Sequence, residues 1–407
     1  MILNFFAGQY LNYVENKLKR KVLYITFLLL NLSVLLYYKY TNFIVDNVNL
    51  FISNDIIIDK IALPLAISFF TFQKFAYITD SYRGETKGYK FLDFCLFVAF
   101  FPQLIAGPIV HHKVIMPQFQ DKNNLKLNLE NVTKGSYMFL MGLFKKIVIA
   151  DTFALMANAG YANVPELTFL DSWLTSLSYT VQLYFDFSGY SDMAIGVGLI
   201  FNIHLPLNFN SPYKSNNIQD FWRRWHITLG NFLREYIYIP LGGNQKGEYQ
   251  TLFNLFVTFL VGGIWHGANW NFLIWGALHG LALVIHRVWI KRGYFLPNIL
   301  SWILTFFFVN FTWVFFRALT FNDAIIVLKC MLGGTGGVRN GSVVFTDIFT
   351  LPVVVLGVIL LFLKNPQELT KEFKPNIPHL IYMVVLALIS TLYLNSITSS
   401  DFLYFDF

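Results

Sequence analysis

Apolar residues form long runs along most of the chain, and short polar stretches separate these runs. A helix needs about 20 mostly apolar residues to cross the hydrocarbon core of a bilayer, and several runs approach or exceed that length. The pattern predicts an all-α fold, a polytopic integral membrane helical bundle of roughly ten helical segments. The predicted apolar segments are 22–38, 56–78, 91–110, 137–156, 167–187, 192–205, 251–290, 296–316, 324–332, 350–363 and 380–394.

The composition agrees with this pattern. Hydrophobic residues make up 56% of the chain and charged residues 13%, and the mean hydropathy is +0.52, which does not fit a soluble globular protein. No fixed-period repeat and no soluble domain interrupts the runs, so residues 1–407 are expected to form a single membrane domain. The two cysteines, Cys95 and Cys330, lie in separate apolar segments and are expected to be structural thiols.

The charge balance predicts an orientation. The 30 Lys and Arg residues exceed the 23 Asp and Glu residues, and in multi-pass membrane proteins such a surplus lies mainly in cytoplasmic loops. The basic clusters at 16–21, 223–234 and 364–374 are therefore predicted to face the cytoplasm. A nucleic-acid partner is the other explanation of a basic chain. It is disfavoured because these residues interrupt apolar spans and do not form one surface.

Residues 218–239 have the pattern of an amphipathic helix, with apolar residues at three- and four-residue spacing and arginines on the other side. Asn217 is a suitable N-cap, Asp220 complements the helix dipole, and Pro240 ends the pattern. The arginines predict that this helix lies at the cytoplasmic interface or dips inward within the protein. His226 falls at the edge of the apolar face, where a packed structural histidine is the alternative to a functional one.

The run 251–290 is about twice as long as one span requires. Two helices that meet at a break near its middle would explain this length, with His266 at or beside the break. A histidine in apolar surroundings at membrane depth is costly, which makes His266 a candidate for a functional site. His279 shares a face with small residues and is expected to pack or to form hydrogen bonds. The residues that predict the break are Gly262, Gly263, His266, Gly267 and Asn269.

Lys145 and Lys146 lie inside the apolar run 137–156 and must snorkel, pair or line water. We expect them to pair with Asp151. Contact with an anionic acyl donor is the alternative.

Asp186 and Asp192 flank Gly189 six residues apart, so they do not share one helical face. We expect a helix break with local caps there, and no general acid/base pair. His111 and His112 are expected to be solvated loop residues. The glycine-rich stretch 333–341 lacks the Lys and Ser/Thr of a phosphate-binding loop and is expected to be a flexible turn.

Four stretches carry a resemblance to a known family. They are DFWRRWH at 220–226, YIPLGGN at 238–244, GGIWHGANWNFLIWGALHG at 262–280 and PLAISFFTFQKFAYITDSYRG at 64–84. Taken together, these stretches resemble the membrane-bound O-acyltransferase family, and within it the bacterial branch that O-acetylates alginate and other polysaccharides. The core motif region is 220–280.

The resemblance implies roles for individual residues. His266 matches the catalytic histidine of the family, and His226 matches a second, less uniform polar position. Neutral imidazole suits the removal of a hydroxyl proton during acyl transfer, because its pKa lies near the working pH. His226 and Asn269 are candidate donors to the oxyanion of the intermediate. Residues expected to contribute to donor or substrate binding are Trp222, Arg223, Arg224, Trp265 and Asn269.

The resemblance also implies an O-acetyltransferase in the bacterial inner (cytoplasmic) membrane, with helices around a central tunnel. It would move an acetyl group from a cytoplasmic thioester, acetyl-CoA by analogy, towards a cell-surface or exported polysaccharide, directly or through a second extracytoplasmic acyltransferase. No cofactor is expected. The histidines lack the close spacing of zinc sites, so no metal is expected either. Alternatives are D-alanyl transfer to teichoic acid, peptidoglycan O-acetylation, or a glycan transporter or assembly protein without catalysis.

Overall fold

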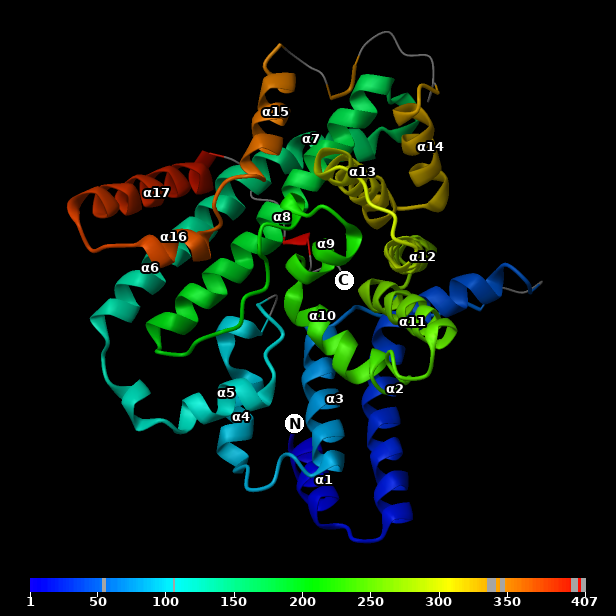
Figure 1. Ribbon diagram of the computed structural model, residues 1–407, viewed down its shortest axis with the longest axis vertical. Helices are drawn as coiled ribbons and strands as arrows, with labels where there is room; N and C mark the ends of the chain where they lie inside the picture. Colours follow the sequence, from blue (N-terminus) through cyan, green and yellow to red (C-terminus); the bar gives the residue numbers. More distant parts are fainter. Residues whose placement is uncertain (53–55, 105–106, 335–341, 345–347, 397–401, 404–407) are drawn as a thin grey trace.

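The computed structural model describes residues 1–52, 56–104, 107–334, 342–344, 348–396 and 402–403, and most of the glycine-rich stretch 333–341 lies outside them. Within these ranges helices alternate with turns and irregular segments, and no β-strand occurs, so the predicted all-α class is confirmed (Figure 1). The α-helices are α1 Ile2–Tyr13, α2 Lys17–Asn49, α3 Ile67–Arg83, α4 Phe91–Ala99, α5 His112–Gln120, α6 Leu129–Phe144, α7 Asp151–Ala162, α8 Phe169–Ile200, α9 Ile218–Arg224, α10 Ile227–Leu233, α11 Glu248–His266, α12 Trp270–Lys291, α13 Asn298–Arg317, α14 Phe321–Met331, α15 Thr350–Leu360, α16 Pro366–Glu372 and α17 Ile377–Ser396.

Four helices in the described ranges are long and apolar enough to cross a membrane, namely α2, α12, α13 and, over Ile377–Asn395, α17. They correspond to the predicted segments 22–38, 296–316 and 380–394 and to the second half of 251–290. The chain is therefore a multi-pass membrane protein. The helices in the described ranges are more numerous than the roughly ten segments expected, and several are shorter than the predicted segments. The reason is that polar turns divide several of the apolar runs.

Two predicted spans are wrong. In the segment 56–78 the helix α3 begins only at Ile67, whose N–H donates to the carbonyl of Pro64 over 3.2 Å, so the proline precedes the helix. The segment 350–363 contains α15, whose 11 residues extend about 16 Å, roughly half of the hydrocarbon core. The segment 91–110 contains α4, which ends at Ala99.

Helix α8 runs through the centre of the molecule without interruption from Phe169 to Ile200 (Figure 1). The predicted break at Gly189 is wrong, because this glycine serves close packing. A Cβ added to Gly189 would lie 2.8 Å from the carbonyl oxygen of Gly142 on α6, and one added to Gly142 would lie 2.6 Å from the carbonyl oxygen of Gly189. The two backbones touch here, and only glycine permits this approach.

The central helices position the candidate site. Helices α9 and α10 lie between α8 and the pair α11 and α12 (Figure 1). Their contact surface is a cluster of large buried aromatic side chains, among them Trp225, Trp275 and Trp313. Trp275 and Trp313 stack with ring centroids 5.8 Å apart, which joins α12 to α13. Rigid aromatic packing of this kind holds the neighbouring polar side chains in fixed positions.

Candidate active site

The predicted amphipathic helix at 218–239 is divided at Trp225 and His226. Its predicted start is confirmed, because the side chain of Asn217 accepts a hydrogen bond from the N–H of Asp220 over 2.8 Å. Helix α9 ends at Arg224, and α10 begins at Ile227 after His226 adopts a left-handed backbone with φ 43° and ψ 53°. Such a conformation is uncommon for a non-glycine residue and occurs often at functional sites.

Asn208 holds this break and orients His226. Its Oδ1 accepts hydrogen bonds from the N–H of Thr228 over 3.3 Å and from the Thr228 hydroxyl over 2.9 Å. His226 Nδ1 lies 3.0 Å from the same oxygen. Because a carbonyl oxygen can only accept, Nδ1 carries the ring hydrogen of neutral His226, and Nε2 carries the lone pair. His226 is fully buried, and its ring contacts Phe187 with centroids 4.7 Å apart.

The predicted break within 251–290 is confirmed. His266 is the last residue of α11, Gly267 is extended, and α12 begins at Trp270. A Cβ on Gly263 would lie 2.4 Å from the carbonyl oxygen of Phe272, so the two helices approach as closely as backbones can. The glycines of this stretch therefore fold the run back on itself and leave His266 at the turn.

Three aromatic rings surround His266, which is 3% exposed. The ring centroids of Trp265 and Trp275 lie 5.0 Å from that of His266, and the ring of Phe316 lies at 5.1 Å. The same aromatic cluster reaches His226, because Trp313 packs against Trp225, the sequence neighbour of His226, and against Phe316 beside His266. Two imidazoles in an apolar enclosure thus form the centre of the candidate site.

The side chain of Asn269 fixes the start of α12. Its Oδ1 accepts a hydrogen bond from the N–H of Asn271 over 2.9 Å, and its Nδ2 donates to the carbonyl of Leu319 over 3.0 Å. Trp265 stacks on Phe72 with centroids 4.7 Å apart. Both residues therefore shape the turn around His266. Their roles in substrate binding, and that of Asn269 at the oxyanion, stay predictions.

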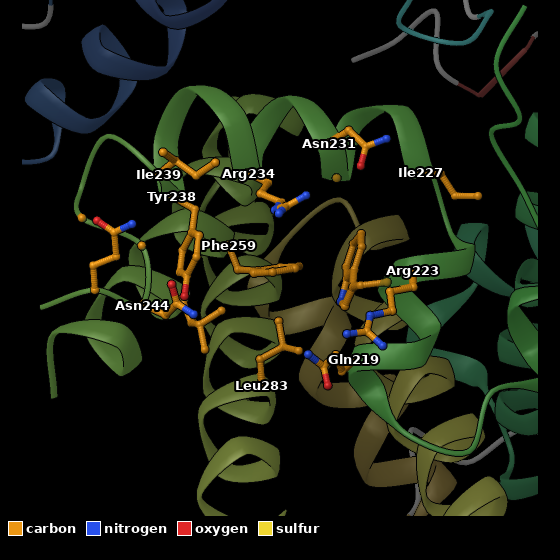
Figure 2. Close-up of a pocket in the computed structure, with 16 residues that line it drawn as sticks. Gln219, Arg223, Ile227, Asn231, Arg234, Tyr238, Ile239, Asn244, Phe259 and Leu283 are labelled. Atoms are coloured by element: carbon orange, nitrogen blue, oxygen red, sulfur yellow. The ribbon is translucent and has the colours of Figure 1, made fainter. Parts of the chain in front are cut away.

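A cavity of about 810 Å³ lies beside α9, α10 and the π-helical turn η6 (Arg234–Tyr238). Figure 2 shows Arg234 and Phe259 directed into this space, with Gln219 and Arg223 on the opposite wall. Arg223 and Trp222, both predicted to bind the donor, line it. Its lining is Gln219, Trp222, Arg223, Ile227, Gly230, Asn231, Arg234, Tyr238, Ile239, Gly242, Gly243, Asn244, Gln245, Leu255, Phe259 and Leu283.

Arg224 has different contacts. Its Nε donates to Asp220 over 2.9 Å and its Nη1 to the carbonyl of Asn210 over 3.4 Å. It is not among the residues that line the cavity. Arg224 thus braces α9 against the preceding segment, while its neighbour Arg223 reaches the cavity.

Trp222 forms part of the wall between this cavity and His266. Its indole N–H donates to His279 Nδ1 over 3.2 Å, so Nε2 of neutral His279 carries the hydrogen and donates to the hydroxyl of Thr312 over 3.0 Å. This confirms the predicted hydrogen-bonding role of His279. Trp222 also packs edge-to-face on Trp275, which in turn contacts His266. Two tryptophan rings therefore separate the cavity from the histidine.

Lys145 and Lys146 are buried and paired with carboxylates. Lys146 contacts Asp151 over 2.6 Å, as predicted, and Asp186 over 3.1 Å. Lys145 pairs with Asp192 over 2.6 Å, so the prediction that both lysines share Asp151 is wrong for this one. The two aspartates of α8 are ion-pair partners, which corrects their predicted role as caps. These pairs join α6 and its π-helical extension η3 (Lys145–Ala150) to α8.

His111 and His112 do not lie in a solvated loop, which corrects a second prediction. His112 is fully buried, and both Nε2 atoms lie 2.9 Å from Asp80 Oδ2. Burial lowers the pKa of His112. The possible ligand atoms of this trio lie within 4.8 Å of one another, a spacing that suits a metal ion. Arg83, 3.1 Å from Asp80, and Lys113, at 4.0 Å, already supply counter-charge, so the cluster is a complete hydrogen-bonded network.

Buried imidazoles beside a basic cavity in a multi-helix membrane protein are an arrangement that suits acid–base chemistry within a membrane. Comparison with known proteins identifies the family. The model of the membrane-bound O-acyltransferase family matches residues 5–322. The chain belongs to this family, and it is an acyltransferase.

Similar proteins are named for the acylation of peptidoglycan, alginate or teichoic acid. The chain is 44% identical to a peptidoglycan O-acetyltransferase of Helicobacter pylori, in a match that covers 100% of the chain and 86% of that protein. It is 46% identical to a probable alginate O-acetylase of Pseudomonas aeruginosa, over 71% of the chain and 56% of that protein. A teichoic acid D-alanyltransferase of Bacillus subtilis is 29% identical over 63% of the chain and 69% of its own length.

Proposed function

We propose that this acyltransferase moves an acetyl group from acetyl-CoA on the cytoplasmic side of the bacterial inner membrane to a hydroxyl group of peptidoglycan. The observation that carries the proposal is the pair of buried histidines, His226 and His266, with two tryptophan rings between His266 and a cavity lined by arginines. Peptidoglycan is the favoured acceptor because the relative that matches the whole chain is named for it. An exported polysaccharide is the second candidate, favoured by the alginate O-acetylases.

The cavity suits the donor. Arg223 and Arg234 line it. The adjoining cavity of about 430 Å³ shares Arg234 and adds Arg287 and Lys291, which pair with Glu248. Guanidinium and ammonium groups bind phosphate oxygens through charge-assisted hydrogen bonds, and coenzyme A carries several phosphates. We propose that the nucleotide end of the donor is held here and that its thioester arm passes Trp222 to reach His266.

The imidazole of His266 then acts as general base. The acceptor hydroxyl oxygen attacks the thioester carbonyl carbon while His266 takes the hydroxyl proton. The tetrahedral intermediate collapses, the carbon–sulfur bond breaks, and the leaving sulfur takes the proton back from His266, which yields free coenzyme A and the acetyl ester. His226 Nε2, which carries a lone pair, accepts a hydrogen bond from a second hydroxyl of the acceptor and so orients it, because the attacking hydroxyl has one hydrogen and gives it to His266. In this tautomer Nε2 has no hydrogen to donate, so His226 is not the oxyanion donor expected from the sequence.

The acceptor lies outside the cytoplasm, so the acetyl group must cross the membrane. The aromatic enclosure between the cavity and the far side is the proposed route. The hydroxyl that reaches His266 belongs either to the glycan itself or to a second extracytoplasmic acyltransferase, which then passes the acetyl group to the glycan. A transporter or assembly protein of the same fold would have no use for a buried imidazole pair or a basic donor cavity.

The test uses inverted membrane vesicles that contain the protein, radiolabelled acetyl-CoA outside and peptidoglycan fragments inside. His266→Ala should lower acetyl transfer by about 10²- to 10⁴-fold at equal abundance, because a general base is lost. His204→Ala is the matched control, since His204 is exposed. Full transfer by His266→Ala would refute the assignment of the base, and transfer of intact glycan without acetylation would show a transporter. Transfer from D-alanyl carrier protein in place of acetyl-CoA would identify a D-alanyltransferase.

A further inference from the structure

A lysine in the first long span reaches the candidate active site. Lys39 belongs to α2, which is one of the helices able to cross the membrane, yet its side chain is buried at 9% exposure. Within the described residues its ammonium group has no carboxylate partner, in contrast to the buried Lys145 and Lys146. A lysine side chain that is buried in a span without an acidic partner is costly and is expected to have a function.

The partners of Lys39 are the last carbonyls of α11. Its Nζ donates to the carbonyl of Trp265 over 2.5 Å, to that of His266 over 3.1 Å and to the hydroxyl of Ser68 over 3.3 Å. The next residue, Tyr40, donates its hydroxyl to the carbonyl of Ile264 over 2.5 Å. Two neighbouring residues of α2 thus hold three consecutive carbonyls at the end of α11, and the two helices lie beside each other in Figure 1.

The end of α11 needs such partners. The last four carbonyls of a helix have no N–H partner within the helix, and many helices satisfy them with a left-handed residue that turns the chain back. Here Gly267 is extended, with φ −167° and ψ 155°, so the chain leaves α11 without that turn. A cation at a helix C-terminus also complements the helix dipole.

We propose that Lys39 is a positioning residue for acyl transfer. It holds the final turn of α11 so that the His266 imidazole stays aimed at the reacting hydroxyl. Lys39 acts through His266 and does not touch the substrate. This inference rests on the proposed role of His266 as general base.

The test compares three variants with wild type in the vesicle assay. Lys39→Met keeps the length of the side chain but removes the charge and its donors. Lys39→Arg keeps both, and Tyr40→Phe removes only the neutral hydrogen bond to Ile264. Abundance and thermal stability are measured for each, so that kcat refers to folded protein.

Lys39→Met should lower kcat by about 10- to 100-fold, because this factor accompanies the loss of hydrogen bonds from a charged donor. The KM for acetyl-CoA should stay within about twofold of the wild-type value. Lys39→Arg should recover at least half of this loss on a logarithmic scale. Tyr40→Phe should stay within about threefold of wild type, because a neutral bond contributes less.

Three outcomes would overturn the inference. One is an unchanged kcat in Lys39→Met. Another is an equal loss in Tyr40→Phe, which would show a general support of α11. The third is a raised KM with normal kcat, which would place Lys39 in donor binding. His266→Ala is run in parallel: if it keeps full activity, the proposed base is wrong, whereas a dead His266→Ala with an active Lys39→Met refutes the role of Lys39 alone.

Discussion

Replacing Asn208 with Ala removes the acceptor that holds the break between α9 and α10. Asn208 is fully buried, and its Oδ1 accepts from both His226 and Thr228. Three buried donors, His226 Nδ1 and the N–H and hydroxyl of Thr228, would lose their acceptor. Each such loss costs about 1–3 kcal/mol, so the free energy of unfolding should fall by about 3–9 kcal/mol. Because His226 would also lose its preferred tautomer and ring orientation, kcat should fall by about a further 10- to 100-fold per folded molecule.

Asn310→Ala is the matched control for this prediction. Asn310 is also fully buried, and it bonds Ser176 and Thr180 of α8, away from the two histidines. Both variants should lower the midpoint of thermal unfolding in detergent, but only Asn208→Ala should lower the kcat of acetyl transfer after correction for the folded fraction. Equal kcat values for the two variants would refute the argument that Asn208 orients His226.

Three further predictions follow from the packing, the thiols and the charges. Gly263→Ala should destabilise the protein by about 1–3 kcal/mol, because its Cβ would meet the α12 backbone. The control Gly262→Ala should destabilise it less, because its Cβ would meet only a movable leucine side chain, and equal melting temperatures for the two variants would contradict this. A double variant Cys95→Ser, Cys330→Ser should keep acetyl transfer, since burial raises the pKa of Cys330 and makes this thiol unreactive. Loss of activity at normal abundance would indicate an acyl-cysteine intermediate. Lys246→Cys should react with an impermeant thiol reagent only from the cytoplasmic side, and labelling from outside would reverse the predicted orientation.

The sequence predicts the helix break beside His266 better than the helix break at His226. The break before α12 is encoded locally, because Gly267 and the capping side chain of Asn269 interrupt an apolar run. The break at His226 leaves no comparable signal, since the residues around it keep a helical spacing through the kink. It exists because Asn208, from a preceding irregular segment, bonds Thr228 across it.

Other predictions fail for the same reason, because a residue far away in the sequence decides the structure. Gly189 suggests a helix break in the sequence, but it permits the contact between α6 and α8. His111 and His112 follow a proline-containing turn and look solvated until α3 places Asp80 against them. In each case a partner distant in the chain decides the role of the residue, and local periodicity carries no information about that partner.

The contact between α2 and the end of α11 also has a consequence for how the protein is made. Lys39 and His266 are 227 residues apart in sequence, and helices enter the membrane in the order of their synthesis. The first long span is therefore made long before the helix whose end it supports. The turn that carries His266 gains the contact with Lys39 only when α11 has been inserted, so this part of the candidate site assembles late in biogenesis.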